Sequence, residues 1–370
     1  MTIAKTNPES DKLAAGARRS LDEQGLNTGP SPSQLGSRFI TPAELFFTRS
    51  HAAIPSLDAA NWRLRVHGLV GRKLELSLDD LKHSFTAREV DATLVCAGLR
   101  RTELENVAPI PGELPWGLEP ISTGTWRGIQ LRDVLLSAGV EEDAGHVWFT
   151  SVDVVERHGK KFAFGGSIPL AKALGPEVLL AYELNGEPLS PDHGFPVRAL
   201  VPGYIGARSV KWLGEIEVRA EPSANYFQTQ AYRLLAKRDG DDGNVRNGTE
   251  MNETPLNAVI LSPEAGGQVP AGAAELSGWA LGREGAPVMV VECSGDNGDT
   301  WTPAEVYASG SPWAWQLWRA TLTLAAGSHT LVVRCSDGRG LTQPPDVKDV
   351  WNVKGYGNNA WHRVAVEVRA

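Results

Sequence analysis

The chain has 370 residues, of which 42% are hydrophobic and 22% are charged, and its formal net charge is −8 at pH 7. This length accommodates two domains, and the composition excludes disorder throughout the chain. The acidic balance argues against nucleic acid or an anionic membrane as a main partner, because either usually requires a basic surface. No stretch approaches the roughly 20 consecutive apolar residues that span a bilayer.

Residues 1–38 are predicted to form a flexible N-terminal arm, because Gly, Ser, Asn and Pro recur there and apolar residues are sparse. We expect order to begin near Phe39. The first 34 residues lack the apolar core of a signal peptide, and the pair Arg18-Arg19 is not followed by one. We therefore expect a cytoplasmic protein, unless a leader has been removed from a longer precursor.

Residues 39–236 are predicted to form an α+β domain, because strand and helix patterns alternate along them. The run Val90 to Val95 is rich in β-branched side chains and predicts a strand that leads into Cys96. Ser77 precedes a predicted short helix that carries acidic residues in its first turn, where the helix dipole favours them. The other predicted elements are strands over 61–70, 146–154 and 210–218 and helices over 131–138 and 169–174.

Cys96 is followed at once by small residues and by Arg100 and Arg101. A thiolate is a nucleophile and a soft metal ligand, and neighbouring cations lower the pKa of a thiol and hold anions beside it. A cysteine at the end of an apolar strand also packs as an ordinary core residue. The residues alone therefore leave a reactive thiol, a metal ligand and a packed side chain open.

Residues 237–254 are predicted to form an exposed linker, because they are polar and rich in turn pairs such as Asp-Gly and Asn-Gly. Residues 255–370 are predicted to form an all-β immunoglobulin-like sandwich. Cys293 and Cys335 end two of its strands; their pairing is not decided by the sequence, and a cytoplasmic location favours reduced, packed thiols. The predicted strands are 258–261, 274–280, 288–293, 316–324, 329–335 and 362–368.

A further group of basic residues lies among glycines and prolines in the segment 192–213. Cationic side chains, with glycines that let backbone amides approach closely, suit a phosphate-bearing ligand. The alternative is a solvated face with surface ion pairs, which the Gly and Pro punctuation disfavours.

Several of these segments resemble the sulfite oxidase family. Cys96-Ala97-Gly98-Leu99-Arg100-Arg101 resembles the family's Cys-Ala-Gly-Asn-Arg-Arg signature, and Phe46 to His51 resembles its Phe-x-x-Arg-Asn-His segment. The segment 192–213 resembles its pterin phosphate site, 227–233 its tyrosine segment, and 313–318, 351–356 and 359–364 its dimerisation domain. The resemblance covers about residues 39–370 and is to a haem-free bacterial or plant-like type.

The resemblance implies a molybdopterin cofactor, in which a pyranopterin dithiolene and Cys96 hold molybdenum. The residues that it places around the cofactor are Arg49, Ser50, His51, Cys96, Asp153, His193, Arg198, Arg208, Ser209, Val210 and Lys211. The catalytic residues that it implies are Tyr232, Arg49, Arg101, Lys354 and Trp116. Tyr232 would assist proton movement, Trp116 would wall the substrate pocket, and the three cations would neutralise the substrate.

The activity implied is oxidation of sulfite to sulfate by oxygen-atom transfer. Since the chain has no haem or flavin motif, electrons would pass to a separate acceptor such as oxygen or a cytochrome. Residues 255–370 would form a homodimer. The alternative on the same scaffold is reduction of nitrate or of a sulfoxide. Four positions differ from the usual family residues, namely Ser50, Leu99, Ala231 and Lys354; Lys354 keeps a positive charge but lacks the planar fork of arginine.

Overall fold

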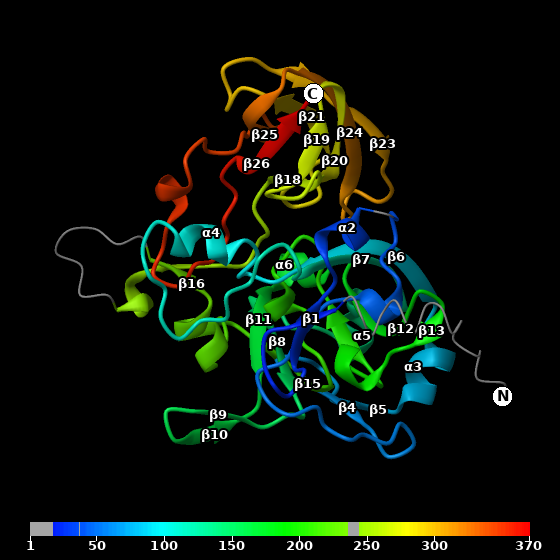
Figure 1. The fold of residues 1–370 in the computed structure, drawn as a ribbon. Coiled ribbons are helices and arrows are strands. Elements are labelled where there is room, and N and C mark those ends of the chain that lie inside the picture. The colour runs from blue at the N-terminus through cyan, green and yellow to red at the C-terminus, as the bar shows by residue number, and fades with distance from the viewer. Residues whose placement is uncertain (1–17, 37, 236–243) are drawn as a thin grey trace.

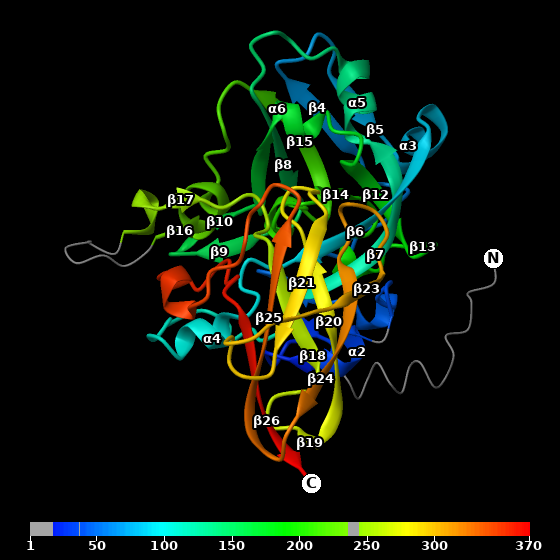
Figure 2. The same cartoon turned by 90° about the horizontal axis from the view of Figure 1, so that it is seen from above.

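A computed structural model describes residues 18–36, 38–235 and 244–370 of the chain. The described residues form two parts, with the C-terminal part above the larger N-terminal part in Figure 1 and the same two parts seen from above in Figure 2. The structure is mostly sheet with few helices, so helix contributes less to the N-terminal domain than the α+β prediction suggests. No helix among the described residues is long and apolar enough to cross a membrane.

Two five-stranded arrangements organise the N-terminal domain. One sheet has the order β11 (Gly165–Pro169), β8 (His146–Ser151), β15 (Leu213–Arg219), β4 (Leu64–Gly68) and β5 (Leu74–Leu76). The second has the order β13 (Glu187–Pro188), β12 (Leu179–Leu184), β7 (Ile121–Gln130) and β6 (Ala87–Val95), with β14 (Arg198–Leu200) also pairing with β12. Strands β6, β8 and β14 of these sheets position three of the site residues discussed below.

The remaining elements of this domain are short. The small pairings are β1 (Arg19–Ser20), β2 (Asn27–Gly29) and β3 (Thr48–Arg49), the hairpin β9 (Val155–Arg157) and β10 (Lys160–Phe162), and β16 (Arg233–Leu234) with β17 (Thr249–Glu250). The α-helices are α2 (Pro32–Leu35), α3 (Leu78–Ser84), α4 (Arg101–Glu105), α5 (Leu131–Ala138) and α6 (Leu170–Ala173). Single turns are η1 (Ala43–Leu45), η2 (Pro191–His193), η3 (Gly206–Arg208), the π-turn η4 (Phe227–Ala231) and η5 (Val245–Asn247).

Local sequence explains the helices that were predicted. The Ser77 hydroxyl accepts a hydrogen bond from the Asp80 N–H and caps α3, as expected. Helix α5 has the predicted bounds and ends at Gly139, whose φ of 72° lies in the left-handed region that glycine adopts without strain. Its apolar side, including Val134 and Leu135, is fully buried in the domain core.

The C-terminal domain consists of two sheets that share one core. The four-stranded sheet has the order β18 (Asn257–Ser262), β20 (Gly272–Leu281), β24 (Gln316–Leu324) and β23 (Glu305–Ala308). The five-stranded sheet has the order β19 (Gln268–Pro270), β26 (His362–Arg369), β25 (Gly327–Asp337), β21 (Val288–Ser294) and β22 (Thr302–Pro303), and η6 (Val347–Val350) precedes β26. Alternate residues of β26 are buried and exposed, which is the pattern of a strand with one face on a core.

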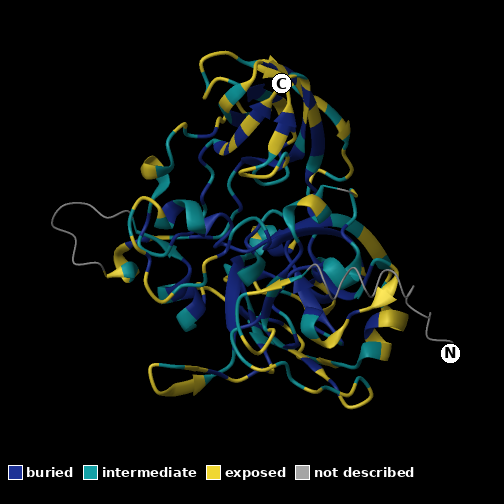
Figure 3. Cartoon of the chain, viewed as in Figure 1, coloured by how far each residue is buried: buried dark blue, intermediate teal, exposed yellow. Residues whose placement is uncertain are grey.

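Cys293 and Cys335 are buried in this core and form no disulfide. The prediction of reduced, packed thiols is therefore confirmed. Figure 3 shows buried residues through the interior of both domains, while the hairpin of β9 and β10 is largely exposed.

The prediction that order begins near Phe39 is wrong for residues 18–36. Strand β2 pairs with β3, and Asn27 and Leu35 are buried. Few apolar residues are needed there, because the backbone of β2 completes a small sheet and Leu35 alone enters the apolar cluster between the domains. Residues 1–17 of the predicted arm lie outside the described residues.

The predicted linker is also partly wrong. Its residues 236–243 lie outside the described part, but β17 pairs with β16, and Met251 and Thr254 are buried. Polar side chains of this segment bind buried groups of the N-terminal domain, since Asn252 accepts a hydrogen bond from Arg208 at 2.8 Å. Residues 250–254 are therefore buried or half-buried despite their polarity, whereas Asn244, Arg246, Asn247 and Thr249 are exposed as predicted.

An apolar cluster joins the two domains. Leu99, which follows the cysteine loop, packs with Trp279, Trp315 and Leu261 of the C-terminal domain. The indole N–H of Trp315 also donates to the Phe39 carbonyl at 2.8 Å. Leu99 therefore occupies an apolar interface, which explains why a hydrophobic side chain fits at this position.

Candidate active site

A cavity of about 700 Å³ opens where β3, the end of β6, η2 and β14 meet. This volume includes the space where the cavity opens to solvent. Segments that are far apart in sequence line it, and they carry most of the predicted cofactor residues. The predicted residues that line it are Arg49, Ser50, His51, Cys96, Asp153, His193, Arg198, Ser209, Lys211 and Tyr232.

Cys96 lines this cavity directly after β6 ends. Its N–H donates to the Pro120 carbonyl at 2.9 Å, and its own carbonyl accepts from the N–H of Leu99 at 3.0 Å, so the residue sits at the start of a tight turn. It is a free thiol. The strand fixes the backbone while the turn leaves the sulfur facing the cavity, an arrangement that suits a metal ligand.

One end of the cavity is strongly basic. The Arg198 guanidinium donates to the carbonyls of His193 and Ser209, and the Lys211 ammonium donates to the Ser50 hydroxyl at 2.7 Å and to the Asp192 carbonyl at 2.8 Å. Burial lowers the pKa of Arg198 to about 9, and burial together with Arg198 lowers the pKa of Lys211 to about 7. Burial therefore destabilises the positive charges of Arg198 and Lys211 when the cavity holds no anion, and a bound anion would stabilise them.

His193 has an unused donor or acceptor at this end. Its Nδ1 lies 2.8 Å from the Ser190 hydroxyl, whereas Nε2 is buried without a hydrogen-bond partner among the described residues. Burial lowers the pKa of His193 to about 4, so the ring is neutral at pH 7. A buried polar atom without a partner is costly, and a ligand in the cavity would satisfy it.

Two carboxylates also face the cavity. Burial opposes ionisation of Asp192, yet His193 and hydrogen bonds from Ser190 and Thr48 outweigh it and lower its pKa to about 2. Asp153 accepts a hydrogen bond from the Phe164 N–H at 3.0 Å, and burial raises its pKa. The negative charge of Asp192 only partly offsets the cations at this end.

Arg49 and Tyr232 also line the cavity. The Arg49 guanidinium donates to the Asn27 side-chain oxygen and to the Ser50 carbonyl, both at 2.8 Å. The Tyr232 hydroxyl lies 3.0 Å from Nε2 of His51, and burial raises the pKa of Tyr232. Tyr232 therefore stays protonated at neutral pH.

Five predicted residues do not line this cavity. Trp116 is fully buried in an apolar cluster with Cys96. Val210 is in the domain core, where its carbonyl accepts from the Ala199 N–H. Arg208 is buried and donates to the carbonyls of Phe227 and Met251. Arg101 and Lys354 form a separate group beside the cysteine loop.

That separate group is close to the turn that carries Cys96. A Cβ on Gly98 would lie 2.6 Å from the Arg101 guanidinium, and the Gly357 N–H donates to the Ala97 carbonyl at 2.8 Å. The Arg101 guanidinium lies over the ring of Tyr356, and Tyr356 stacks in turn on Tyr232. Two of the three predicted substrate cations, Arg101 and Lys354, thus do not line the cavity, and Arg101 reaches its lining residue Tyr232 only through the ring of Tyr356.

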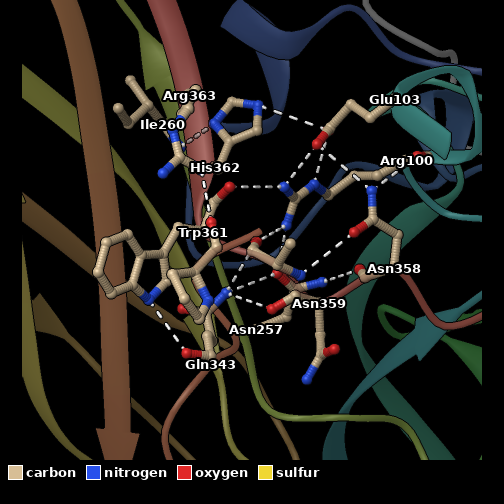
Figure 4. A network of polar contacts seen from close by, with 12 residues as sticks. Arg100, Glu103, Asn257, Ile260, Gln343, Asn358, Asn359, Trp361, His362 and Arg363 are labelled. Carbon is tan, nitrogen blue, oxygen red and sulfur yellow. Dashed lines mark hydrogen bonds and ion pairs between the residues drawn. The ribbon is translucent and has the colours of Figure 1, made fainter. Parts of the chain in front are cut away.

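Arg100 anchors the same turn to the C-terminal domain (Figure 4). Its φ of 62° is in the left-handed region, which is strained for a residue with a side chain, and its side chain is fully buried. The guanidinium donates to Glu103, to Asn257 and to the carbonyl of Ala360, and its own carbonyl accepts from Asn358. These bonds hold the strained turn, so the second domain positions the cysteine loop.

Sequence reasoning missed three residues at this site. Asn27 holds Arg49, Glu113 pairs with both Lys354 and Arg101, and Tyr356 stacks on Tyr232. Asn27 and Glu113 carry no local signal, since an isolated Asn or Glu in a loop is ordinary. Tyr356 lies in the segment 351–356, which resembles the dimerisation domain. Its position two residues after Lys354 is the only sequence feature that points to a place near the site.

Comparison with known proteins gives the family of the chain. Residues 51–227 match the family described as oxidoreductase molybdopterin binding domain, and residues 249–369 match the Mo-co oxidoreductase dimerisation domain. The sulfite oxidase of Gallus gallus is 41% identical over 352 residues, which cover 92% of this chain and 76% of the relative. The chain belongs to the sulfite oxidase family.

Other relatives agree with this placement. The sulfite oxidase of Arabidopsis thaliana is 35% identical, and the match covers 94% of this chain and 93% of that protein. The nitrate reductase of Hordeum vulgare is 36% identical, but the match spans only 40% of that protein. The sulfane dehydrogenase SoxCD of Paracoccus pantotrophus has the same fold, with a TM-score of 0.82, 23% identity and coverage of 100% of this chain and 95% of that one.

As a member of this family, the protein is a molybdenum-dependent oxidoreductase with a molybdopterin cofactor. The cavity fits that group. A free thiol, buried cations and the unpartnered Nε2 of His193 all line it, and a cofactor phosphate requires such donors. No cluster of three or more His, Cys, Asp or Glu side chains that could hold a metal ion occurs among the described residues.

Proposed function

We propose that the protein oxidises sulfite to sulfate. The observation that carries the proposal is the joint presence, around one cavity, of a free thiol, a basic end for a phosphate and an arginine beside a protonated tyrosine. The sulfite oxidases that the chain resembles over most of its length also support it. Sulfite and water give sulfate, two electrons and two protons. When bound, the molybdenum cofactor supplies the oxygen-atom transfer and accepts the two electrons.

The protein's own residues bind the cofactor and compensate charge. The Cys96 thiolate would ligate the metal, while Arg198, Lys211 and His193 would hold the phosphate, aided by Ser209. A phosphate dianion would raise the pKa of Lys211 from about 7, so cofactor binding keeps that ammonium protonated. Arg208 and Val210 would contribute through the backbone that carries them, because their side chains do not line the cavity.

The substrate side requires cations that are fixed before the anion arrives. Arg49 is fixed by Asn27, and Arg101 is fixed by the carbonyls of Leu114 and Lys354. We propose that these two arginines, with the Lys354 ammonium, neutralise the oxyanion. Trp116 would support the Cys96 turn from the apolar side.

Tyr232 would move or hold protons during the transfer of electrons. Burial raises the pKa of its hydroxyl, whereas desolvation and Arg49 lower the pKa of His51 well below its ordinary value. The pair therefore consists of a phenol that keeps its proton and a neutral imidazole within hydrogen-bond distance. Such a pair passes a proton without forming a buried charge at rest.

The assembly, the location and the electron acceptor are further parts of the proposal. We propose that residues 255–370 form an immunoglobulin-like sandwich and make a homodimer, supported by the match to a dimerisation domain. We also propose a cytoplasmic location and a separate electron acceptor. Light scattering after size exclusion tests the dimer; a monomer at every concentration would contradict it.

The activity is tested on purified protein whose molybdenum and pterin contents have been measured. We expect sulfite-dependent reduction of ferricyanide, cytochrome c or oxygen by the wild type, and its loss in Cys96→Ser. Cys293→Ala is the matched control, because Cys293 is a free buried cysteine of the other domain. Loaded protein that reduces no acceptor with sulfite would contradict the proposal. Nitrate or methionine sulfoxide turnover with reduced viologen would instead establish the alternative activity.

A further inference from the structure

Glu113 forms ion pairs with both Arg101 and Lys354, the two predicted substrate cations that do not line the cavity. Its Oε1 accepts a hydrogen bond from the Lys354 ammonium at 2.8 Å, and its Oε2 lies 3.6 Å from the Arg101 guanidinium. The side chain of Arg101 is only 3% exposed, and those of Glu113 and Lys354 are 16% and 26% exposed. One carboxylate is therefore shared by two cations in a partly desolvated place, and part of their positive charge is left uncompensated by it.

The rest of this group holds Arg101 but leaves room for a second anion. Two nitrogens of the guanidinium donate to the carbonyls of Lys354 and Leu114. The third nitrogen has only the longer contact with Glu113 among the described residues. The Lys354 ammonium has three donors, and one of them is used by Glu113. An oxyanion that reached these donors would compete with the carboxylate for the same charges.

Glu113 is on a loop with little backbone support. Between α4 and Trp116 the chain contains Pro109, Pro111 and Pro115, and residues 111 and 112 are exposed. No backbone N–H of residues 109–115 donates to a backbone carbonyl of the described chain. Such a segment opens at low cost compared with the strands around it. Leu114 holds Arg101 and packs on the cluster that contains Cys96, so the movement that frees the carboxylate from the cations is that of the Glu113 side chain.

We propose that Glu113 is an internal competitor of the substrate. It occupies the place between Lys354 and Arg101 in the resting enzyme, and the incoming oxyanion displaces it. Glu113 thereby sets the anion affinity of the enzyme and offsets part of the positive charge of the two cations when no substrate is bound. The inference rests on the proposed function, because it takes the substrate to be a small oxyanion such as sulfite.

The test uses the molybdenum-loaded enzyme and inorganic sulfate as the probe. Glu113→Gln keeps the size and polar contacts of the side chain and removes its charge. We expect the dissociation constant of sulfate, measured by calorimetry, to fall about tenfold, and the KM for sulfite to fall by a similar factor. In a Lys354→Gln background the same change should give a smaller gain. Glu305→Gln is the matched control, because Glu305 pairs with Arg319 on the exposed face of the other domain.

The result that would overturn the proposal is clear-cut. If Glu113 merely supports the two cations, Glu113→Gln will weaken sulfate binding and raise the KM. Unchanged affinity, or no sulfate binding by either protein, would also contradict competition. Failure of the proposed function can be told apart from failure of this inference. In that case the wild type would not turn over sulfite, whereas the sulfate affinities of the wild type and of Glu113→Gln could still be compared.

Discussion

The hydroxyl of Tyr232 lies 3.0 Å from Nε2 of His51, and both side chains line the cavity that contains Cys96. The ring of Tyr232 also stacks on Tyr356, with centroids 5.4 Å apart. Tyr232 thus connects the cofactor cavity to the group of Arg101, Lys354 and Glu113 behind it. A proton carrier at this junction can respond to charge on either side.

Tyr232→Phe removes the hydroxyl and keeps the ring. We expect kcat for sulfite oxidation to fall about tenfold to a hundredfold, because proton transfer loses its donor, while KM changes little. Steady-state assays and rapid-mixing measurement of metal reoxidation would check this. Tyr356→Phe is the matched control, since Tyr356 does not line the cavity. Equal loss of kcat in both variants would indicate a packing effect of the aromatic pair instead.

Lys211→Met removes a buried ammonium at the basic end of the cavity and keeps the length of the side chain. We expect the purified protein to retain about tenfold less molybdenum and pterin, because the cofactor phosphate loses a charge-assisted hydrogen bond. Metal analysis and pterin fluorescence after oxidation would measure this. Lys160→Met, on the exposed hairpin of β9 and β10, should keep wild-type contents. Full cofactor in Lys211→Met would contradict the assignment of this end to the phosphate.

Elements whose signal is local were predicted well from sequence. Helix α5 has the expected bounds because its apolar spacing and Gly139 specify both its face and its end. Cys96 follows β6 as expected, because a β-branched run and a small-residue turn are adjacent in the chain. Resemblance then supplied the residues that meet at the cavity, although they come from distant segments.

What the sequence could not provide is the long-range partner of each charged or polar group. Glu113 and Lys354 are 241 residues apart, and no local pattern marks their pairing. Asn27 falls in a segment whose composition resembles that of an arm, but the Arg49 side chain and the edge of β3 give it partners. Polar segments are ordered by such contacts, which depend on the finished fold.

Asn27→Ala tests the contribution of that N-terminal segment to the site. The Asn27 oxygen accepts from the Arg49 guanidinium at 2.8 Å, and Asn27 is buried. Without it Arg49 loses a fixed orientation, so we expect KM for sulfite to rise about threefold to tenfold with a smaller change in kcat. Asn61→Ala, on an exposed turn, is a suitable control. A wild-type KM in Asn27→Ala would show that the Ser50 carbonyl alone orients Arg49.

His362 belongs to the network that links Arg100 to the C-terminal domain (Figure 4). Its Nδ1 accepts a hydrogen bond from the Ile260 N–H at 3.1 Å, and its Nε2 lies 3.9 Å from Glu103. Burial, together with Arg100, lowers its pKa from 6.5 to about 4, with Glu103 opposing the shift. The native state therefore holds this ring neutral where the unfolded state protonates it.

The stability of the protein should consequently fall as the pH decreases from 6.5 to about 4. In this window the unfolded chain binds a proton at His362 that the native state does not, so the free energy of unfolding decreases by up to about 3 kcal/mol from this group and levels off below the native pKa. Urea unfolding of wild type and His362→Gln at several pH values would measure it. The variant, which does not titrate here, should lose less stability over the window, whereas His83→Gln on the exposed helix α3 should follow the wild type. Parallel curves for wild type and His362→Gln would mean that this buried ring does not couple folding to pH.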